Sequence, residues 1–306
     1  MRRERAPGPG TVPNPRVFIL LAISLILTTL PVSHVHAAAA LRAEHVISVP
    51  CRGGEYFDFT PLGLAFDASG KLYVVDADNS RVMVLRDSFE DMRPFSDIFR
   101  DSVGIHFVDV EIRDGLTVYV SEENRGLLIG FNRLGQPRAQ VDVGQGVAGF
   151  GIGSAGKTCV ANPTYELIRI VYIDGDREAA DVTLPPEEGH LLYVDCLVLD
   201  EGKFVATAAS HKRLLHFNAV GKYLGPFGLN EFSEPYGVAS FAGEYVLVSD
   251  VGEKEIVVLD LKGNRIGSFG KNHLDEPTFL AVRRDGTVCV SDTRSRTVEV
   301  FKIAID

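Results

Sequence analysis

The sequence predicts an all-β protein, a six-bladed β-propeller built from four-stranded antiparallel blades. A step of thirteen residues occurs six times along the chain. It links Gly63, Asp109, Gly149, Asp195, Gly237 and Phe279 to Asp76, Glu122, Asn162, Ala208, Asp250 and Asp292, in that order. Successive end points lie 46, 40, 46, 42 and 42 residues apart. These spacings match the length of one four-stranded propeller blade.

Within each unit, the pattern indicates strand, turn, strand, polar corner, strand, turn and strand. A glycine lies six or seven residues after the start of every step, where a hairpin must reverse and a positive φ is favourable. We expect the inner strands near residues 62–67, 107–112, 148–152, 193–199, 236–241 and 278–283. Six blades then use almost the whole chain after residue 40, and no second domain fits.

The last unit stops after its third strand, near residues 297–303, and therefore lacks an outer strand. Residues 45–50 (HVISVP) form a spare strand at the other end of the chain. We expect this segment to pair with residues 297–303, because that would close the ring and cover an unpaired edge. An N-terminal strand in the last blade thus completes the predicted propeller.

The segment 86–103 carries the apolar series Phe89, Met92, Phe95, Ile98 and Phe99. It is predicted to hold the fourth strand of the first blade, with a hydrophobic plug against the second blade. The alternative is a recognition loop, since loops on a rigid scaffold often carry binding residues.

Several runs resemble NHL repeats. The first unit contains PLGLAFD at 61–67 and LYVVDADNSRV at 72–82, and the fifth contains EPYGVA at 234–239 followed by VLVSD at 246–250. The resemblance covers about residues 46–306 and is degenerate in the third and fourth units. It implies a six-bladed propeller, and such propellers serve as protein-binding, RNA-binding, sensor and occasionally enzymatic modules.

Residues 1–40 are predicted to be a signal peptide that directs export to the periplasm or the exterior. Four arginines precede an apolar run at 17–30, and a small-residue stretch follows at 37–40. Cleavage is expected between Ala37 and Leu41. The alternative is an uncleaved anchor, but fourteen apolar residues fall short of the roughly 17 to 25 that a spanning helix needs. No stable membrane span is expected after cleavage.

The charge of the mature chain argues against one class of partner, the nucleic acids. Without the leader it carries 27 basic and 40 acidic residues, a net charge of about −13. Nucleic-acid binding is therefore not expected, because it depends on clustered Lys and Arg.

Of the four cysteines, Cys159 and Cys196 in adjacent blades are the one pair that could approach each other; the alternative is that all four are small buried residues.

The corner residues Asp76, Asp250 and Asp292 are interpreted as structural. A carboxylate at the end of a second strand can accept hydrogen bonds from backbone N–H groups of the next turn. Its recurrence in several blades is what a structural role requires.

Asp109 and Asp195 are the candidate ligand-binding residues, with Glu111 beside the first. They replace glycine on alternate blades near one mouth of the predicted channel. Two carboxylates there could bind Ca²⁺ or a cationic ligand through oxygen atoms. The alternative is that each carboxylate accepts hydrogen bonds from a neighbouring inner strand.

The resemblance also suggests two enzyme hypotheses. Amidating lyases, which resemble NHL propellers, bind zinc through histidines directly after a proline, but Tyr236 and Thr278 occupy those places here. His106, His190 and His273 lie at differing offsets from the repeat. Gluconolactonase-like propellers hold calcium at the channel mouth, and only Asp109 and Asp195 match them. The preferred hypothesis is an exported, non-catalytic module that binds a protein or ligand, with no resident cofactor; a calcium-dependent hydrolase is the alternative.

Overall fold

The computed structural model describes residues 40–306, except for 52–57, 87, 91, 97, 100–101, 103, 176–178, 183–191 and 229–231. The expected signal peptide therefore lies outside the described residues, apart from Ala40. In the described part, 24 strands form six four-stranded sheets in which every pair of neighbouring strands is antiparallel. The six-bladed propeller predicted from the sequence is confirmed.

Each blade is numbered by its place in the chain. Blade 1 contains β2 (Pro61–Phe66), β3 (Leu72–Asp76), β4 (Arg81–Leu85) and β5 (Met92–Ser96). Blade 2 contains β6 (Phe107–Arg113), β7 (Thr117–Glu122), β8 (Leu127–Phe131) and β9 (Pro137–Asp142). Blade 3 contains β10 (Phe150–Ile152), β11 (Lys157–Asn162), β12 (Leu167–Tyr172) and β13 (Ala180–Val182).

The second half of the ring is built in the same way. Blade 4 contains β14 (Tyr193–Val198), β15 (Phe204–Ala208), β16 (Arg213–Phe217) and β17 (Tyr223–Phe227). Blade 5 contains β18 (Pro235–Phe241), β19 (Tyr245–Asp250), β20 (Glu255–Asp260) and β21 (Arg265–Phe269). Blade 6 contains β22 (Pro277–Val282), β23 (Thr287–Asp292), β24 (Thr297–Ile305) and β1 (Leu41–Pro50). Three short 3₁₀ turns are described at Ser154–Gly156, Asp200–Gly202 and Ala209–His211.

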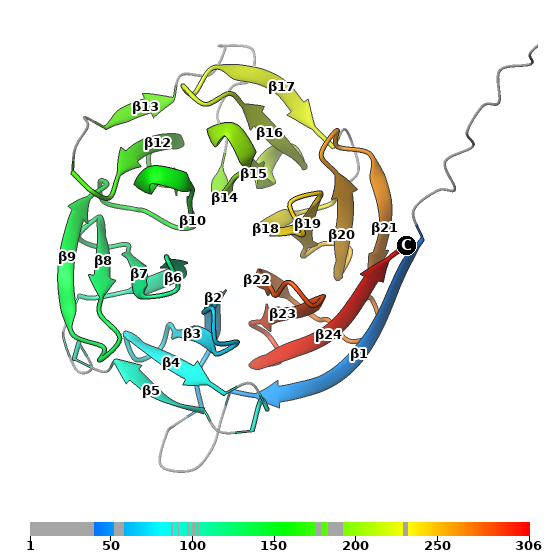
Figure 1. Cartoon of the computed structure of the whole chain (residues 1–306), viewed down its shortest axis with the longest axis horizontal. Helices are drawn as coiled ribbons and strands as arrows, with labels where there is room; N and C mark the ends of the chain where they lie inside the picture. Colours follow the sequence, from blue (N-terminus) through cyan, green and yellow to red (C-terminus); the bar gives the residue numbers. More distant parts are fainter. Residues whose placement is uncertain are drawn as a thin grey trace, which may run out of the picture. The chain divides into compact units, whose positions relative to one another are not determined.

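The inner strands of the six blades surround a common axis (Figure 1). Each packs against the inner strand of the next blade, and β22 packs against β2 to complete the ring. The apolar core lies between blades: Phe107 and Phe131 of blade 2, for example, pack with Val75 and Val82 of blade 1. Because each blade presents one face to each neighbour, its middle strands are almost completely buried.

Blade 6 is closed by the N-terminal strand, as predicted. β1 pairs with β24 from Leu41 opposite Ile305 to Pro50 opposite Thr297, with a bulge between His45 and Ile47. Figure 1 shows β1 (blue) running along β24 (red) at the rim. The buried carboxylate of Glu299 on β24 accepts a hydrogen bond from the Ser48 hydroxyl at 2.6 Å and lies 2.7 Å from the His45 ring.

The repeated glycines occupy the hairpins that the sequence predicts. Gly70, Gly115, Gly156, Gly202, Gly243 and Gly286 have φ values between 62° and 85°. In each of these hairpins the positive φ lets the chain reverse between the first and second strands without a Cβ penalty.

Residues 86–103 contain the fourth strand of blade 1, β5, as the first of the two predictions for this segment stated. Phe95 on β5 packs with the apolar cluster shared by blades 1 and 2, as does Phe99. Phe89 and Met92 pack on the other side of blade 1. Ile98 is 57% exposed and does not join either cluster.

All four cysteines are buried and free. Cys159 and Cys196 pack in one cluster between blades 3 and 4. Burial raises the pKa of the Cys196 thiol, and a hydrogen bond with the Cys159 side chain adds to the effect. The four cysteines are thus small buried residues, and Cys159 and Cys196 approach each other as two thiols and not as a disulfide.

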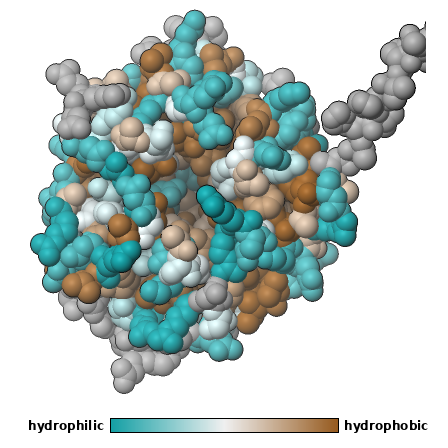
Figure 2. All heavy atoms as spheres, viewed as in Figure 1, coloured by the Kyte–Doolittle hydropathy of each residue, from teal (hydrophilic) through white to brown (hydrophobic). Residues whose placement is uncertain are grey.

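The face of the propeller in Figure 2 is a mosaic of polar and apolar residues. Single large apolar side chains are exposed at scattered positions, among them Leu134, Val220 and Tyr165. Across the residues described, none belongs to a helix with the length and apolar character to cross a membrane.

Candidate functional site on the inner strands

Asp109 and Asp195 lie at equivalent places on the inner strands of blades 2 and 4. In each blade the pairing of the first two strands shifts register there, between Phe107 and Val110 and between Tyr193 and Cys196. Such a bulge takes a residue out of the regular ladder and re-aims its side chain. The freed N–H groups of Asp109 and Asp195 donate to hydroxyl groups of the second strand, those of Ser121 and Thr207, each at 3.0 Å.

Both carboxylates are buried, and both of their oxygens accept backbone hydrogen bonds. Oδ1 of Asp109 accepts from Val110 N–H at 2.8 Å, and Oδ2 accepts from Phe150 N–H in blade 3 at 3.0 Å. Oδ1 of Asp195 accepts from Cys196 N–H at 2.7 Å, and Oδ2 accepts from Val238 N–H in blade 5 at 2.8 Å. Each aspartate therefore links its own blade to the next one.

Glycines of the preceding blades make room for these aspartates. A Cβ atom on Gly63 would lie 2.6 Å from the Val110 nitrogen, and one on Gly149 would lie 2.8 Å from the Asp195 Cα. Real Cβ atoms do not approach other atoms this closely. The alternation of glycine and aspartate is thus a packing relation between neighbouring blades, and Gly237 faces Phe279 in the same way.

Glu111 lies two residues after Asp109 on β6 and belongs to the same acidic cluster. Burial raises its pKa to about 8, and the charge of Asp195 adds to this. Burial also raises the pKa of Asp195 to about 7, against two backbone hydrogen bonds that lower it. For Asp109, burial and then the charges of Asp195 and Glu111 raise the pKa. The charges of Asp195 and Glu111 thus act on Asp109, and the charge of Asp195 acts on Glu111.

Tyr236 joins this cluster, a role that was not predicted from the sequence. Burial raises its pKa to about 12, and the charges of Asp195 and Asp109 contribute next. Its ring packs edge-to-face on Phe279 at 5.4 Å between centroids. A signal was present in the sequence: Tyr236 directly precedes Gly237, the blade 5 member of the alternating series.

The candidate metal ligands do not come together as a metal site. Among the described residues, no group of three or more His, Cys, Asp or Glu side chains could hold a metal ion. The oxygens of Asp109 and Asp195 are already engaged by N–H donors, which a cation would have to displace. The arrangement does not fit a calcium ion, which takes six to eight oxygen ligands.

The histidines of the zinc alternative lie apart from this cluster in their contacts. The His106 ring pairs with Glu123 at 2.7 Å. The His273 ring stacks on His45, with 4.0 Å between centroids. His190 lies outside the described residues.

The corner aspartates accept hydrogen bonds from nearby turns. Asp76 accepts from the Asn79 backbone at 3.0 Å and from the Arg81 side chain at 2.6 Å. Asp250 accepts from the N–H groups of Glu234 and Glu253, and Asp292 accepts from those of Glu276 and Ser295. The bonds from Glu234 and Glu276 join the corners of blades 5 and 6 to the segments that enter those blades, whereas the bonds to Asp76 lie within its own corner.

Comparison with known proteins shows the fold alone. No protein-family model and no curated protein matches the chain. A streptogramin B lyase has 12% identity over 87% of this chain and 98% of its own, with a TM-score of 0.63. A protein of unknown function from Bacteroides thetaiotaomicron has 10% identity over 87% of this chain and 76% of its own, with a TM-score of 0.66.

The propeller in a nidogen/laminin complex is a third similar structure. It has 16% identity over 73% of this chain and 85% of its own chain, with a TM-score of 0.61. These solved structures are six-bladed propellers, and at such low identity the similarity shows a shared architecture alone. The chain is accordingly a six-bladed β-propeller.

Proposed function

We propose that the protein is an exported, non-catalytic propeller of the NHL type that binds a ligand or protein partner. The bonding of Asp109 and Asp195 carries this proposal. Both residues use their carboxylate oxygens to tie blades 2 and 4 to the blades that follow. These inter-blade hydrogen bonds give Asp109 and Asp195 a role in the stability of the ring.

The calcium-dependent hydrolase is the less favoured function. It would need oxygen ligands turned toward one cation, whereas these aspartates turn toward backbone N–H groups. Lyase activity is not carried over from the streptogramin B lyase either, because fold similarity at 12% identity says little about function.

Export is part of the proposal and rests on the predicted signal peptide at residues 1–40. The proposed compartment is the periplasm or the exterior. The expected charge of the mature chain favours protein or small-molecule partners over nucleic acid.

Metal analysis of the purified mature protein, followed by calorimetric titration with Ca²⁺, tests the proposed function. We expect no stoichiometric metal and no saturable heat of binding. One tightly bound calcium per chain would contradict the proposal and favour the hydrolase. The titration is repeated after dialysis against a chelator, so that a site already filled with Ca²⁺ is not overlooked.

A further inference from the structure

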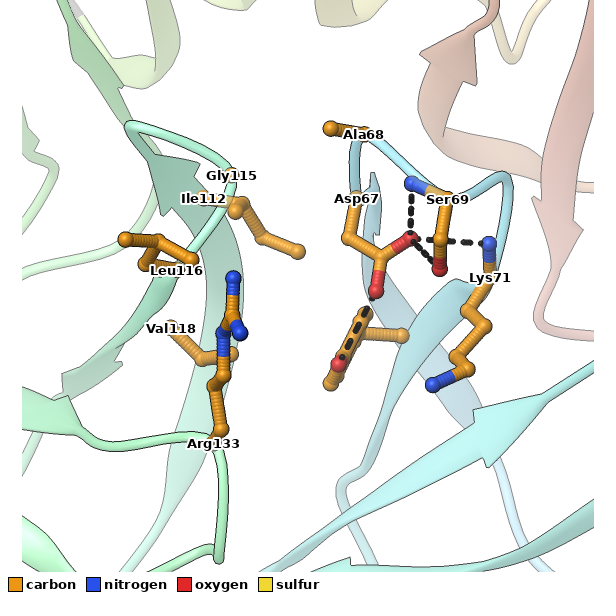
Figure 3. A pocket seen from close by; sticks show the side chains of 10 residues that line it. Asp67, Ala68, Ser69, Lys71, Ile112, Gly115, Leu116, Val118 and Arg133 are labelled. Carbon is orange, nitrogen blue, oxygen red and sulfur yellow. Dashed lines mark hydrogen bonds between the residues drawn. The ribbon is translucent and has the colours of Figure 1, made fainter.

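A cavity of about 400 Å³ lies at the junction of blades 1 and 2 (Figure 3). We call it the blade 1–2 notch. One wall is the turn between β2 and β3, residues 67–71. The opposite wall comes from blade 2, where Ile112, Leu116 and Val118 supply apolar surface, and Arg133 lies in the turn after β8.

Two cationic side chains border the open space. Figure 3 shows the Lys71 ammonium on one side and the Arg133 guanidinium on the other. Neither side chain forms an ion pair with a described residue. The notch therefore combines positive charge with an apolar wall, as sites for small organic ligands do.

Asp67 is the one carboxylate among the described lining residues, and its own turn engages it. Oδ1 accepts from the N–H groups of Ser69 at 2.8 Å and Lys71 at 3.0 Å. Oδ2 accepts from the Tyr73 hydroxyl at 3.3 Å. Burial and then the Asp67 charge raise the pKa of Tyr73 to about 12, so this hydroxyl keeps its proton at neutral pH.

The positive lining continues beyond the notch. A second cavity of about 370 Å³ shares Lys71, Tyr73 and Arg133 with it and adds Arg86 and Arg93. Four cationic residues thus surround two adjoining cavities.

The chain holds an internal comparison for this site. A cavity of about 330 Å³ occupies the equivalent junction of blades 4 and 5. The turns match, because Asp67 N–H bonds to the Lys71 carbonyl as Leu199 N–H bonds to the Lys203 carbonyl.

The charges of the two junctions differ. Lys203 pairs with Glu201 at 2.8 Å, whereas the residue in the place of Glu201 in the blade 1 turn is Ser69. Leu261 lines the second cavity in the place that Arg133 has in the first. The repeat therefore generates a cavity at both junctions. The lining of the blade 1–2 notch is net positive, with Lys71 and Arg133 against Asp67, whereas that of the second cavity is net negative, with Lys203 against Asp200 and Glu201.

We propose that the blade 1–2 notch binds small organic anions. A carboxylate or phosphate group would lie between Lys71 and Arg133, since a guanidinium can hold two oxygens of such a group at once. An apolar body attached to it would cover Ile112 and Leu116. This site would give the proposed binding function a ligand class, and the inference rests on that proposed function.

Titration with 2-naphthoate, its neutral analogue 2-naphthamide and inorganic phosphate tests the site. We expect 2-naphthoate to bind with millimolar or better affinity and to shift the methyl NMR signals of Ile112, Leu116 and Val118. Naphthamide and phosphate are expected to bind at least about tenfold more weakly, which is roughly 1.4 kcal/mol. Phosphate binding that equals or exceeds naphthoate binding would overturn the role of the apolar wall.

Matched variants locate the binding. Arg133→Leu introduces the residue type found at Leu261, and Lys71→Met removes the second cation; each should weaken 2-naphthoate binding about tenfold. Lys203→Met makes the same change at the equivalent position of blade 4 and should leave binding unchanged.

Three results would overturn the site: no binding by the wild type, equal binding of naphthamide, or equal effects of Lys71→Met and Lys203→Met. Thermal unfolding of each variant confirms that it is folded. These results are independent of the calcium titration, so failure of the notch and failure of the non-catalytic function are told apart.

Discussion

At three junctions of the ring, an inner-strand glycine faces a larger residue of the next blade. The pairs are Gly63 with Asp109, Gly149 with Asp195, and Gly237 with Phe279. Because the aspartates also bond to the blade after their own, blades 1 to 5 are linked by side chain as well as by apolar packing. Glycine in blades 1 and 3 and aspartate in blades 2 and 4 thus occupy the same repeat position for one reason: each glycine leaves the space that the aspartate of the next blade fills.

The substitution Gly149→Ala tests this packing relation. The new Cβ would lie 2.8 Å from the Asp195 Cα, so the two inner strands must move apart. We expect a loss of about 2 to 4 kcal/mol in the free energy of unfolding, measured with urea. The control is Gly267→Ala, whose Cβ would meet only the flexible Leu41 side chain. Equal effects of the two substitutions would contradict the close approach.

The raised pKa of Glu111 leads us to expect that stability depends on pH. A carboxyl group whose pKa is higher when folded holds its proton more tightly in the folded state. The pKa of Glu111 is about 4.3 in the unfolded chain and about 8 in the folded chain. Protonated Glu111 therefore contributes fully to the stability of the fold below about pH 4.3, and this contribution is lost as the pH rises through about 8.

The substitution Glu111→Gln should therefore remove part of this loss. Between about pH 5 and pH 8.5 we expect the wild type to lose at least about 1 kcal/mol relative to Glu111→Gln, because one pKa unit corresponds to roughly 1.4 kcal/mol. Urea unfolding at both pH values measures it, with the exposed Glu244→Gln as control. Parallel pH profiles for wild type and Glu111→Gln would show that Glu111 keeps a normal pKa.

At the scale of elements, the sequence predicted the blades, the hairpins and the closing strand, because period, turn glycines and strand runs are local properties. It left the direction of the Asp109 side chain open. That direction depends on a bulge between Phe107 and Val110, which the thirteen-residue step does not reveal. The blade 1–2 notch was missed because Lys71 and Arg133 come from turns of different blades and share no motif.

The closing strand β1 gives the clearest prediction at this scale. A mature chain that lacks residues 41–50 would leave one edge of β24 unpaired and break the only strand pairing that joins the two ends of the described propeller. We expect its melting temperature to fall by about 10 °C or more, with a broader transition. Calorimetry measures both. A truncated chain that melts like the full mature chain would exclude this role for β1.

At the scale of the whole molecule, the ring is a rigid support whose surface chemistry varies from blade to blade. The fold is shared with a streptogramin B lyase and with a propeller of a nidogen/laminin complex, so architecture alone does not determine a function. The charges at equivalent junctions do differ, as the comparison of Lys71 with Lys203 shows. Function is therefore best sought where one blade departs from the repeat.

Export is a prediction for the molecule as a whole. Protein recovered from the cell envelope or medium should begin between Ala38 and Leu41, and intact-mass measurement identifies the first residue. A chain that retains the apolar run at residues 17–30 would indicate an anchor instead.

The central claim is that Asp109 and Asp195 join blades and do not hold a metal. The melting temperature of the double variant Asp109→Asn, Asp195→Asn, measured with millimolar Ca²⁺ and with a chelator, tests it most directly. An Asn side chain places an N–H donor against a backbone N–H, so we expect the variant to melt about 5 °C or more below the wild type, equally in both conditions. A wild type that calcium stabilises, and a variant that calcium no longer stabilises, would contradict the claim and restore the metal site.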